Sequence, residues 1–367
     1  MTALTLNEFI TRDYAAELPP DELLRAHRLM LLARKLDERC WILHRQGKIA
    51  FHISGIGQEA CQLAVGMALR PGRDYYFPHY RDLVTVLALG MTPLDIFLST
   101  YGKADDPSSH GRQMPNHYNL AAQRIVSISS PTATQVPQCA GVAFAIKLRG
   151  EQKVAMCALG EGATSQGDWH EGLNWAGIHR LPFICLVENN HYAISVPLDK
   201  QMAVAGPAER AYGYGMPGVV YDGNDFFASY NATREAVERA RRGDGPTLLE
   251  ARTTRLTAHS SDDDDRTYRD RAELEAQKQR DPLPLFTQAL VSRGLLSQAA
   301  LHATEAEVLA EIDEAQTAAL AAAYPQPEET LLGVFVADSV GDRAVRAWCW
   351  PGGRLPQSPA EEHADGR

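Results

Sequence analysis

The sequence has 367 residues, and its 46 acidic and 36 basic side chains give a formal net charge of −10. This acidic surplus argues against nucleic-acid binding, because neutralising phosphates requires clustered lysine and arginine. No run of 18 apolar residues is present, which argues against a membrane-spanning helix. Residues 1–12 lack the apolar segment of a signal peptide and the composition of a transit peptide. We therefore expect a globular protein of the cytoplasm that binds neither nucleic acid nor membrane.

The cysteines indicate a reducing compartment. None of the six forms a CxxC pair, which argues against a zinc site or a disulfide framework. Most lie in apolar surroundings, where buried and reduced thiols are common. The six are Cys40, Cys61, Cys139, Cys157, Cys185 and Cys349.

The first third of the chain is predicted to be mainly helical. Residues 1–20 are expected to form an irregular arm. Apolar residues then recur at helical spacing over 21–48, and shorter helices are predicted over 58–70 and over 83–101, the latter with Pro93 near a turn. The stretch that follows, through residue 120, is rich in Gly, Pro and His and predicts a long loop. Long loops inside compact domains are often functional.

From about residue 138 the pattern changes to helices that alternate with short apolar strands. Strands separated by helices of this length form parallel βαβ units. The sequence therefore predicts an α/β fold, a doubly wound and mostly parallel sheet flanked by helices. The predicted strands are 153–159, 182–188, 219–221 and 247–256, and the predicted helices are 138–147, 166–178 and 226–242.

Helical extensions are expected on both sides of this sheet, because Ala- and Glu-rich helical patterns continue to about residue 323. We expect three segments. These are an N-terminal arm at 1–20, an α/β domain with helical extensions at 21–335, and a partly disordered tail at 336–367, which is rich in Pro, Gly and acidic residues.

The strongest functional signal lies where two predicted strands end. The first strand leads into GEGA at 160–163, and the second leads into ENNHY at 188–192. Neighbouring parallel strands end at one crevice, so Glu161 and Asn190 can converge there. The two glycines allow a ligand close to the backbone, and the helix that begins near Ser165 offers free N–H groups to a phosphate. Carboxylate, amide and carbonyl oxygens suit Mg²⁺. The pattern predicts a site for Mg²⁺ and a diphosphate.

This pattern resembles the thiamine-diphosphate motif, in which GDG is followed, two dozen or more residues later, by NN. Here 26 residues separate Gly162 from Asn189. More narrowly, residues 20–335 resemble the α subunits of the first component of 2-oxo acid dehydrogenases, most of all the branched-chain type. The motifs that carry this resemblance are FPHYRD (77–82), GRQMPNH (111–117), SSPTATQVPQ (129–138), GEGATSQGD (160–168), ENNHYAIS (188–195), DGNDFFASYNATREA (222–236) and HSSDDDDRTYR (259–269).

The resemblance implies a thiamine-diphosphate-binding fold and a set of site residues. His259 is the implied catalytic residue, beside the diphosphate and the reacting centre. The implied Mg²⁺ ligands are Glu161, the Asn190 side chain and the Tyr192 carbonyl. The implied cofactor contacts are Tyr80, Arg81, Ser130, Thr132, Gly160, Glu161, Gly162, Ala163, Asn190 and His259. The implied lining of the substrate pocket is Phe51, Tyr80, Met114 and His117. Ser129, Pro131, Thr134 and Gln135 resemble a K⁺-binding loop.

Three features differ between this sequence and its family patterns. Glu161 stands where the general motif has Asp, but it still offers a carboxylate. GRQMPNH stands where pyruvate-type α subunits usually carry a GGSMH-like sequence, which favours the branched-chain type. Glu188 stands where animal branched-chain enzymes carry Arg, which leaves one diphosphate contact without its usual residue. His79 and His110 are expected to be ordinary polar loop residues.

The resemblance implies decarboxylation of a small branched-chain 2-oxo acid with thiamine diphosphate and Mg²⁺. The acyl group then passes to the lipoamide of a transacylase component, and a neutral His259 shuttles protons near pH 7. Thiamine enzymes also need a module that binds the pyrimidine ring, and one α/β sheet with extensions uses up this chain. The family supplies that module as a β subunit in an α₂β₂ heterotetramer, so we expect the lone chain to be inactive.

Several alternatives stay open. The same scaffold could act on pyruvate or acetoin, because a methylene or two changes specificity by only about 1–3 kcal/mol. The chain could also be a non-catalytic assembly or regulatory subunit. The hypothesis that the chain is a nicotinamide oxidoreductase rests only on GIGQEA at 55–60. This segment lies between helical patterns and lacks a suitable acidic residue downstream. Ser260 stands where mitochondrial relatives are phosphorylated, and we assume no modification here. Asp262–Asp265 lack the spacing of a Ca²⁺ loop and predict a solvated loop.

Overall fold

The computed structural model describes residues 3–327 and residue 329. The chain up to Tyr324 forms one compact unit. The tail expected at 336–367 lies outside the described residues, as does Cys349. The other five cysteines are buried and free, as predicted. Within the described residues, no helix is long and apolar enough to cross a membrane.

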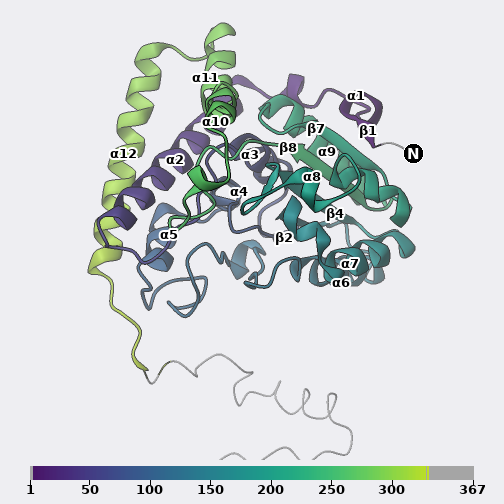
Figure 1. The fold of residues 1–367 in the computed structure, drawn as a ribbon, viewed down its shortest axis with the longest axis horizontal. Coiled ribbons are helices and arrows are strands. Elements are labelled where there is room, and N and C mark those ends of the chain that lie inside the picture. Colours follow the sequence, from purple (N-terminus) through teal and green to yellow (C-terminus); the bar gives the residue numbers. More distant parts are fainter. Residues whose placement is uncertain (1–2, 328, 330–367) are drawn as a thin grey trace, which may run out of the picture. The chain divides into compact units, whose positions relative to one another are not determined.

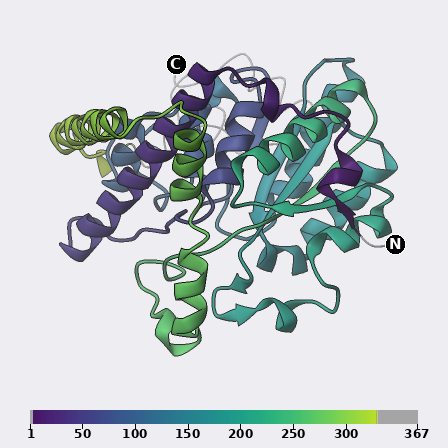
Figure 2. The same ribbon diagram turned by 90° about the horizontal axis from the view of Figure 1, so that it is seen from above.

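A six-stranded parallel sheet lies at the centre of this unit, with helices on both of its faces (Figures 1 and 2). The strand order is β1-β7-β8-β4-β3-β2. The inner strands are apolar and almost wholly buried, as is typical of parallel sheets covered on both sides. The α/β prediction is therefore confirmed. The strands are β1 (Leu4–Thr5), β2 (Tyr75–Phe77), β3 (Ala155–Gly160), β4 (Phe183–Asn189), β7 (Gly218–Asp222) and β8 (Thr247–Arg252).

The two faces of the sheet contribute to two separate cores, because side chains alternate along each strand. On β3, Cys157 belongs to the core beneath α6 (Gln135–Leu148) and α7 (Gly167–Ile178). Its neighbour Met156 belongs to the core on the opposite side. That side is covered by α3 (Glu59–Ala68) and α9 (Phe226–Arg242), which pack against each other.

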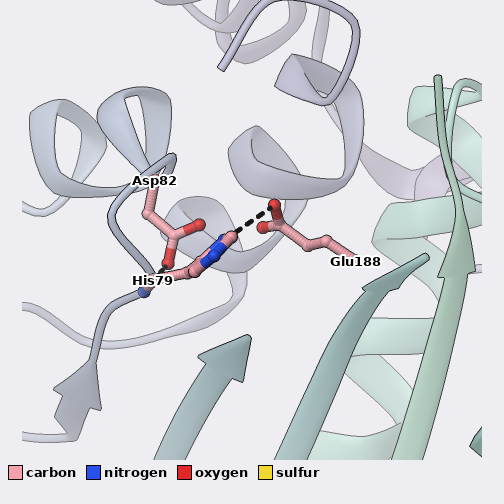
Figure 3. A group of neighbouring side chains, drawn as sticks. All are labelled: His79, Asp82 and Glu188. Atoms are coloured by element: carbon pink, nitrogen blue, oxygen red, sulfur yellow. Dashed lines mark hydrogen bonds and ion pairs between the residues drawn. The ribbon is translucent and has the colours of Figure 1, made fainter. Parts of the chain in front are cut away.

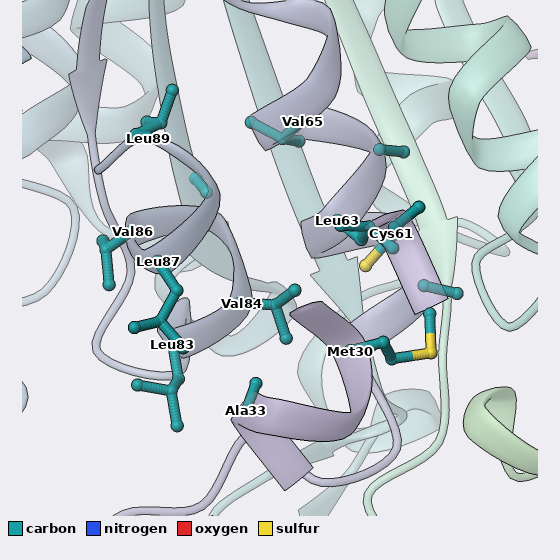
Figure 4. Packing of buried hydrophobic residues seen from close by; sticks show 14 of the residues in the cluster. Met30, Ala33, Cys61, Leu63, Val65, Leu83, Val84, Val86, Leu87 and Leu89 are labelled. Carbon is teal, nitrogen blue, oxygen red and sulfur yellow. The ribbon is translucent and has the colours of Figure 1, made fainter. Parts of the chain in front are cut away.

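The larger core extends beyond the sheet into a layer of helices (Figure 4). Met30 of α2 (Pro20–Arg45), Cys61 of α3 and Val84 of α4 (Leu83–Ala88) all belong to this core. Arg34 of α2 bonds to Glu59 and to Asp281, the cap of α11 (Pro282–Ser292). The remaining elements are α1 (Leu6–Phe9), α5 (Pro93–Thr100), α8 (Leu198–Gln201), α10 (Arg271–Lys278), α12 (Gln298–Ala321), the hairpin of β5 (Tyr192–Ala193) and β6 (Val196–Pro197), and five 3₁₀ turns: Ala15–Glu17, Ala121–Gln123, Glu161–Ser165, Pro207–Tyr214 and Asp265–Thr267.

The prediction of a single helix over 83–101 was wrong. The structure divides this segment into α4 and α5, and the break comes near the expected turn at Pro93. Gly90 has a left-handed φ of 114°, which ends the first helix. Thr92 then accepts a hydrogen bond from the Asp95 backbone N–H and caps the second helix, with Pro93 in its first turn.

The irregular arm predicted at 1–20 was also wrong. Leu4 and Thr5 form β1, which pairs with Val219 and Val220 of β7 and so extends the sheet. Strand β2 at the opposite edge was missed as well. Both strands are too short to show a period-2 pattern, and their pairing is fixed only by contacts with distant parts of the chain.

Candidate active site

A cavity of about 320 Å³ opens at the carboxyl ends of β3 and β4, where the sequence predicts the site. Its wall contains all eleven residues implied for the cofactor and the metal. The lining residues are Ile53, His79, Tyr80, Arg81, Ile128, Ser129, Ser130, Thr132, Ala133, Gln135, Leu159, Gly160, Glu161, Gly162, Ala163, Asn190, Tyr192, Ala193, Ile194 and His259.

Glu161 and Asn190 meet as predicted. Glu161 follows β3 and Asn190 follows β4, and the Asn190 backbone N–H donates to Glu161 Oε2 at 3.2 Å. Tyr192 N–H in turn donates to the Asn190 side-chain oxygen at 3.3 Å. His191 between them has a left-handed φ of 72°, which makes this turn tight. Burial raises the pKa of the Glu161 carboxyl, because its charged form is poorly solvated. A bound cation would favour that charged form.

Two side chains that the sequence analysis missed hold these groups in place. Arg255 donates to the Tyr192 carbonyl at 3.4 Å and to the Ile194 carbonyl at 2.8 Å. Gln201 donates to Glu161 Oε1 at 3.4 Å and to the Val196 carbonyl at 2.8 Å. Gln201 belongs to the short helix α8, forty residues from Glu161, so no local motif connects them.

Gly162 is required by packing. A Cβ atom built on Gly162 would lie 2.6 Å from the Cβ of Ala193, far inside normal contact distance. The turn after β3 therefore packs closely against β5, the strand that carries the Tyr192 carbonyl. This close approach explains why a glycine follows the acidic residue of the motif.

Arg81 joins two loops at one side of the cavity. Its guanidinium donates to the Ser54 carbonyl at 2.5 Å, and to both the carbonyl and the ring Nδ1 of His259 at 3.0 Å. Burial, with a further contribution from Arg81, lowers the pKa of His259 to about 3. The imidazole is therefore neutral near pH 7. Because Nδ1 accepts from Arg81, its proton lies on Nε2. Tyr80 lies at this side too, its ring edge-on to His259 with centroids 6.3 Å apart.

The loop at 129–135 brings together the residues that resemble a K⁺ site. Thr134 Oγ1 contacts Ser129 Oγ and donates to the Pro131 carbonyl at 3.2 Å. Gln135 lines the cavity, but its amide donates to the Ala158 carbonyl of β3 at 3.0 Å. Of these four residues, Ser129 and Gln135 line the cavity, whereas Pro131 and Thr134 do not. Their role in binding K⁺ stays a prediction.

The residues expected to line the substrate pocket are only partly brought together. Tyr80 lines the cavity, whereas Phe51, Met114 and His117 do not. Met114 is 50% exposed. His117 lies next to the cavity wall, with its Nε2 2.9 Å from Ser130 Oγ. The assignment of these residues to a substrate pocket stays a prediction.

His79 and Glu188 differ from expectation. The interpretation of His79 as an ordinary loop residue was wrong, because it is 5% exposed and lines the cavity. Glu188 is fully buried behind the cavity wall, where it accepts from Gln62 Nε2 at 3.2 Å. It therefore cannot take over the diphosphate contact of the arginine found in animal relatives.

The glycines of GIGQEA lie directly before α3 and do not follow a strand of the sheet, which removes the basis for nicotinamide binding.

Comparison with known proteins agrees with this geometry. The model of the family described as "Dehydrogenase E1 component" matches residues 27–328. The 2-oxoisovalerate dehydrogenase subunit alpha of Bacillus subtilis is 49% identical over 324 residues, 88% of this chain and 98% of that relative. The mitochondrial 2-oxoisovalerate dehydrogenase subunit alpha of Mus musculus is 40% identical, over 76% of this chain and 62% of that relative.

A more distant relative carries another substrate in its name. The pyruvate dehydrogenase E1 component subunit alpha of Staphylococcus aureus is 37% identical, over 83% of this chain and 81% of that relative. All three relatives are named as alpha subunits of 2-oxo acid dehydrogenases, and the family model covers most of the chain. The protein therefore belongs to the dehydrogenase E1 component family.

Proposed function

We propose that this chain is the α subunit of a branched-chain 2-oxo acid dehydrogenase that uses thiamine diphosphate and Mg²⁺. The observation that carries the proposal is the meeting of Glu161, Asn190 and Tyr192 at the wall of one cavity, in a chain that belongs to the E1 family. The enzyme decarboxylates a 2-oxo acid and passes the acyl group to the lipoamide of a transacylase component.

The residues present fit a Mg²⁺–diphosphate group. Glu161 supplies a buried carboxylate, Asn190 an amide oxygen and Tyr192 a backbone carbonyl, which are the hard oxygen ligands that Mg²⁺ prefers. Gly162 lets the turn that carries Glu161 pack closely against Ala193, next to the Tyr192 carbonyl. When bound, thiamine diphosphate supplies the electron sink for decarboxylation, which no protein side chain provides.

The protein's own residues orient and stabilise the bound diphosphate, the Mg²⁺ ligands and the reacting group. Arg81 presents a fixed positive charge beside the cavity, suited to diphosphate oxygens. His259 is held through Nδ1, so its Nε2 proton can be donated to a reacting group. Gln201 and Arg255 hold the Glu161 carboxylate and the Tyr192 carbonyl, and thereby fix two of the three proposed Mg²⁺ ligands. We extend the proposal to K⁺ at the loop of Ser129, Pro131, Thr134 and Gln135.

The active assembly requires a β subunit, in an α₂β₂ heterotetramer. Two observations support this part of the proposal. The relatives are named as alpha subunits, and the chain up to Tyr324 contains a single α/β unit. The β subunit would supply the carboxylate that activates the pyrimidine ring, and the cavity would lie at the α/β interface.

The branched-chain substrate is favoured over pyruvate by the comparisons. The Bacillus subtilis relative named for 2-oxoisovalerate is 49% identical, whereas the Staphylococcus aureus relative named for pyruvate is 37% identical. Pyruvate or acetoin remains the second candidate, since related folds accept them by small changes in the acyl pocket.

The test is to co-express the chain with its β subunit and to assay a panel of 2-oxo acids with an artificial electron acceptor. Thiamine diphosphate and Mg²⁺ are each supplied or omitted. We expect turnover that needs both and that prefers 3-methyl-2-oxobutanoate or 4-methyl-2-oxopentanoate. A preference for pyruvate would keep the site but overturn the substrate. A stable complex that binds the cofactor but does not turn over would favour a non-catalytic subunit. Turnover by the lone chain would refute the need for a β subunit.

A further inference from the structure

A second polar cluster lies behind the cavity, in the interior of the protein (Figure 3). It consists of His79 from the loop after β2, Asp82 at the start of α4, and Glu188 near the end of β4. One nitrogen or oxygen atom from each residue lies within 4.8 Å of the others. The side chains are 5%, 0% and 0% exposed. His79 and Asp82 belong to FPHYRD, and Glu188 begins ENNHYAIS, more than one hundred positions further along the chain.

Each carboxylate has one oxygen that is held and one that is free. Asp82 Oδ2 accepts from Tyr76 Oη at 2.5 Å and from the His79 backbone N–H at 2.6 Å. Glu188 Oε2 accepts from Gln62 Nε2 at 3.2 Å. Within the described chain, Asp82 Oδ1, Glu188 Oε1 and His79 Nδ1 are buried without a hydrogen-bond partner, and so is Gln62 Oε1. Such atoms occur elsewhere in the described chain too, but here four of them gather in one cluster, and a bound ion is one explanation for buried polar atoms without partners.

Among the described residues, no lysine or arginine forms an ion pair with this cluster. The ion-pair neighbour of Glu188 is His79 Nδ1, at 3.7 Å (Figure 3). Arg81 is the nearest guanidinium along the chain, and its donors are directed to Ser54 and His259 instead. The two buried carboxyl groups therefore lie close together with an imidazole as their only ion-pair neighbour among the described residues.

We propose that His79, Asp82 and Glu188 bind a divalent transition-metal ion, with the Gln62 carboxamide as a neighbouring fourth donor. An imidazole nitrogen beside two carboxylates suits Zn²⁺ or Mn²⁺ better than Mg²⁺ or Ca²⁺, which prefer oxygen alone. One oxygen of each carboxylate is already held, by Gln62 or by Tyr76 and a backbone N–H, as is usual around metal ligands. A divalent ion would also balance the two carboxylates.

This site differs from the Mg²⁺ site proposed at Glu161 in both ligands and setting. The Glu161 site uses oxygen ligands at the wall of an open cavity and would be completed by a diphosphate. The His79 cluster is buried, reaches the cavity only through His79, and includes a nitrogen ligand. Its ion would connect the loop that carries Arg81 to the end of β4, and so would stabilise the fold beneath the cavity. It does not depend on the proposed enzymatic function.

The test measures zinc binding by the full-length chain, without an affinity tag and without thiamine diphosphate. Equilibrium dialysis against Zn²⁺ with elemental analysis gives the stoichiometry, and the visible absorption of Co²⁺ reports the ligand geometry. We expect one tightly bound Zn²⁺ per chain. Asp82→Asn and Glu188→Gln should each weaken binding by about a hundredfold or more, whereas Glu161→Gln should retain it. Zn²⁺ should raise the melting temperature of the wild type but not of Glu188→Gln.

Two results would overturn the proposal. The first is a wild-type protein that binds no Zn²⁺ and shows no Co²⁺ absorption band. In that case the two carboxyl groups share a proton, and the cluster does not bind a metal ion. If Asp82→Asn and Glu188→Gln fold, as circular dichroism shows, and still bind Zn²⁺ like the wild type, the ion lies elsewhere. The wild-type measurement decides the question even if both variants fail to fold. Loss of thiamine-dependent turnover in Glu161→Gln with retained Zn²⁺ would separate this site from the proposed function.

Discussion

Two groups of polar side chains lie near the carboxyl ends of the strands, yet their settings differ. Glu161 and Asn190 line an open cavity, in turns that directly follow β3 and β4. Asp82 and Glu188 do not line that cavity and are fully buried, held by Tyr76 and Gln62. The comparison shows that one end of the sheet can support both a site open to a ligand and a buried polar cluster. What separates them is the side chain of His79, which belongs to both regions.

The largest effect is expected from Glu161→Gln. Loss of the carboxylate removes a direct Mg²⁺ ligand, whose charge stabilisation is worth several kcal/mol. We expect turnover of the complex with its β subunit to fall by about 10³-fold or more. Glu171→Gln on the exposed side of α7 is the matched control and should retain turnover. Steady-state rates at saturating Mg²⁺ decide the matter, and equal rates for both variants would contradict the proposed ligand.

Gln201→Leu should have a smaller effect on the same site. Gln201 holds Glu161 and does not itself bind the ion, so its loss is expected to weaken Mg²⁺ binding by about 10–100-fold. The rate at saturating Mg²⁺ should change much less than the Mg²⁺ concentration needed for half-maximal activity. Gln201→Glu, which restores an oxygen near the ion, is the comparison variant. An unchanged Mg²⁺ requirement in Gln201→Leu would show that Gln201 is not a positioning residue.

Gly162→Ala tests the close packing at the cavity. The added methyl group would lie 2.6 Å from the Ala193 Cβ, so the turn must shift, at a cost of about 1–3 kcal/mol in the free energy of unfolding. Gly167→Ala, where a Cβ would meet no atom within 4 Å, should unfold like the wild type. Urea unfolding of both variants gives the comparison. Equal loss of stability at the two positions would contradict the packing argument.

The smallest effect concerns pH. The pKa of His259 is lowered to about 3, whereas an unfolded histidine titrates near 6.5. Below about pH 6.5 the unfolded chain therefore binds a proton that the folded chain does not, and stability falls as the pH falls toward 3. His79 is lowered to about 3 as well and acts in the same direction. His259→Gln should lose less stability than the wild type between about pH 7.5 and 5, as measured by urea unfolding. Parallel pH profiles would contradict this expectation.

The open site was predictable because it depends on a simple rule of sheets. Glu161 and Asn190 each follow an apolar strand, and neighbouring parallel strands end at one edge. His79 and Gln201 were not predictable in this way. Gln201 reaches Glu161 from forty residues further along the chain, and His79, although it precedes Tyr80 and Arg81, meets Glu188 only through the fold.

The helices show the same distinction. Long apolar periodicity predicted α2 well, because its pattern persists over many turns. The break between α4 and α5 depends on single residues, Gly90 and Thr92, whose backbone conformations a periodicity argument does not weigh. Strand β1 is only two residues long, and its existence follows entirely from its partner β7.

That pairing has a consequence for how the polypeptide is made. Leu4 emerges from the ribosome early, but its partner Val219 emerges only after β2, β3 and β4. The amino-terminal segment therefore stays unpaired while most of the sheet is synthesised. Closing this edge of the sheet is a late event, and contacts of such long sequence separation are slow to form. Until β1 pairs with it, β7 is an unpaired edge strand that other nascent chains can contact. The two residues of β1 then cover this edge.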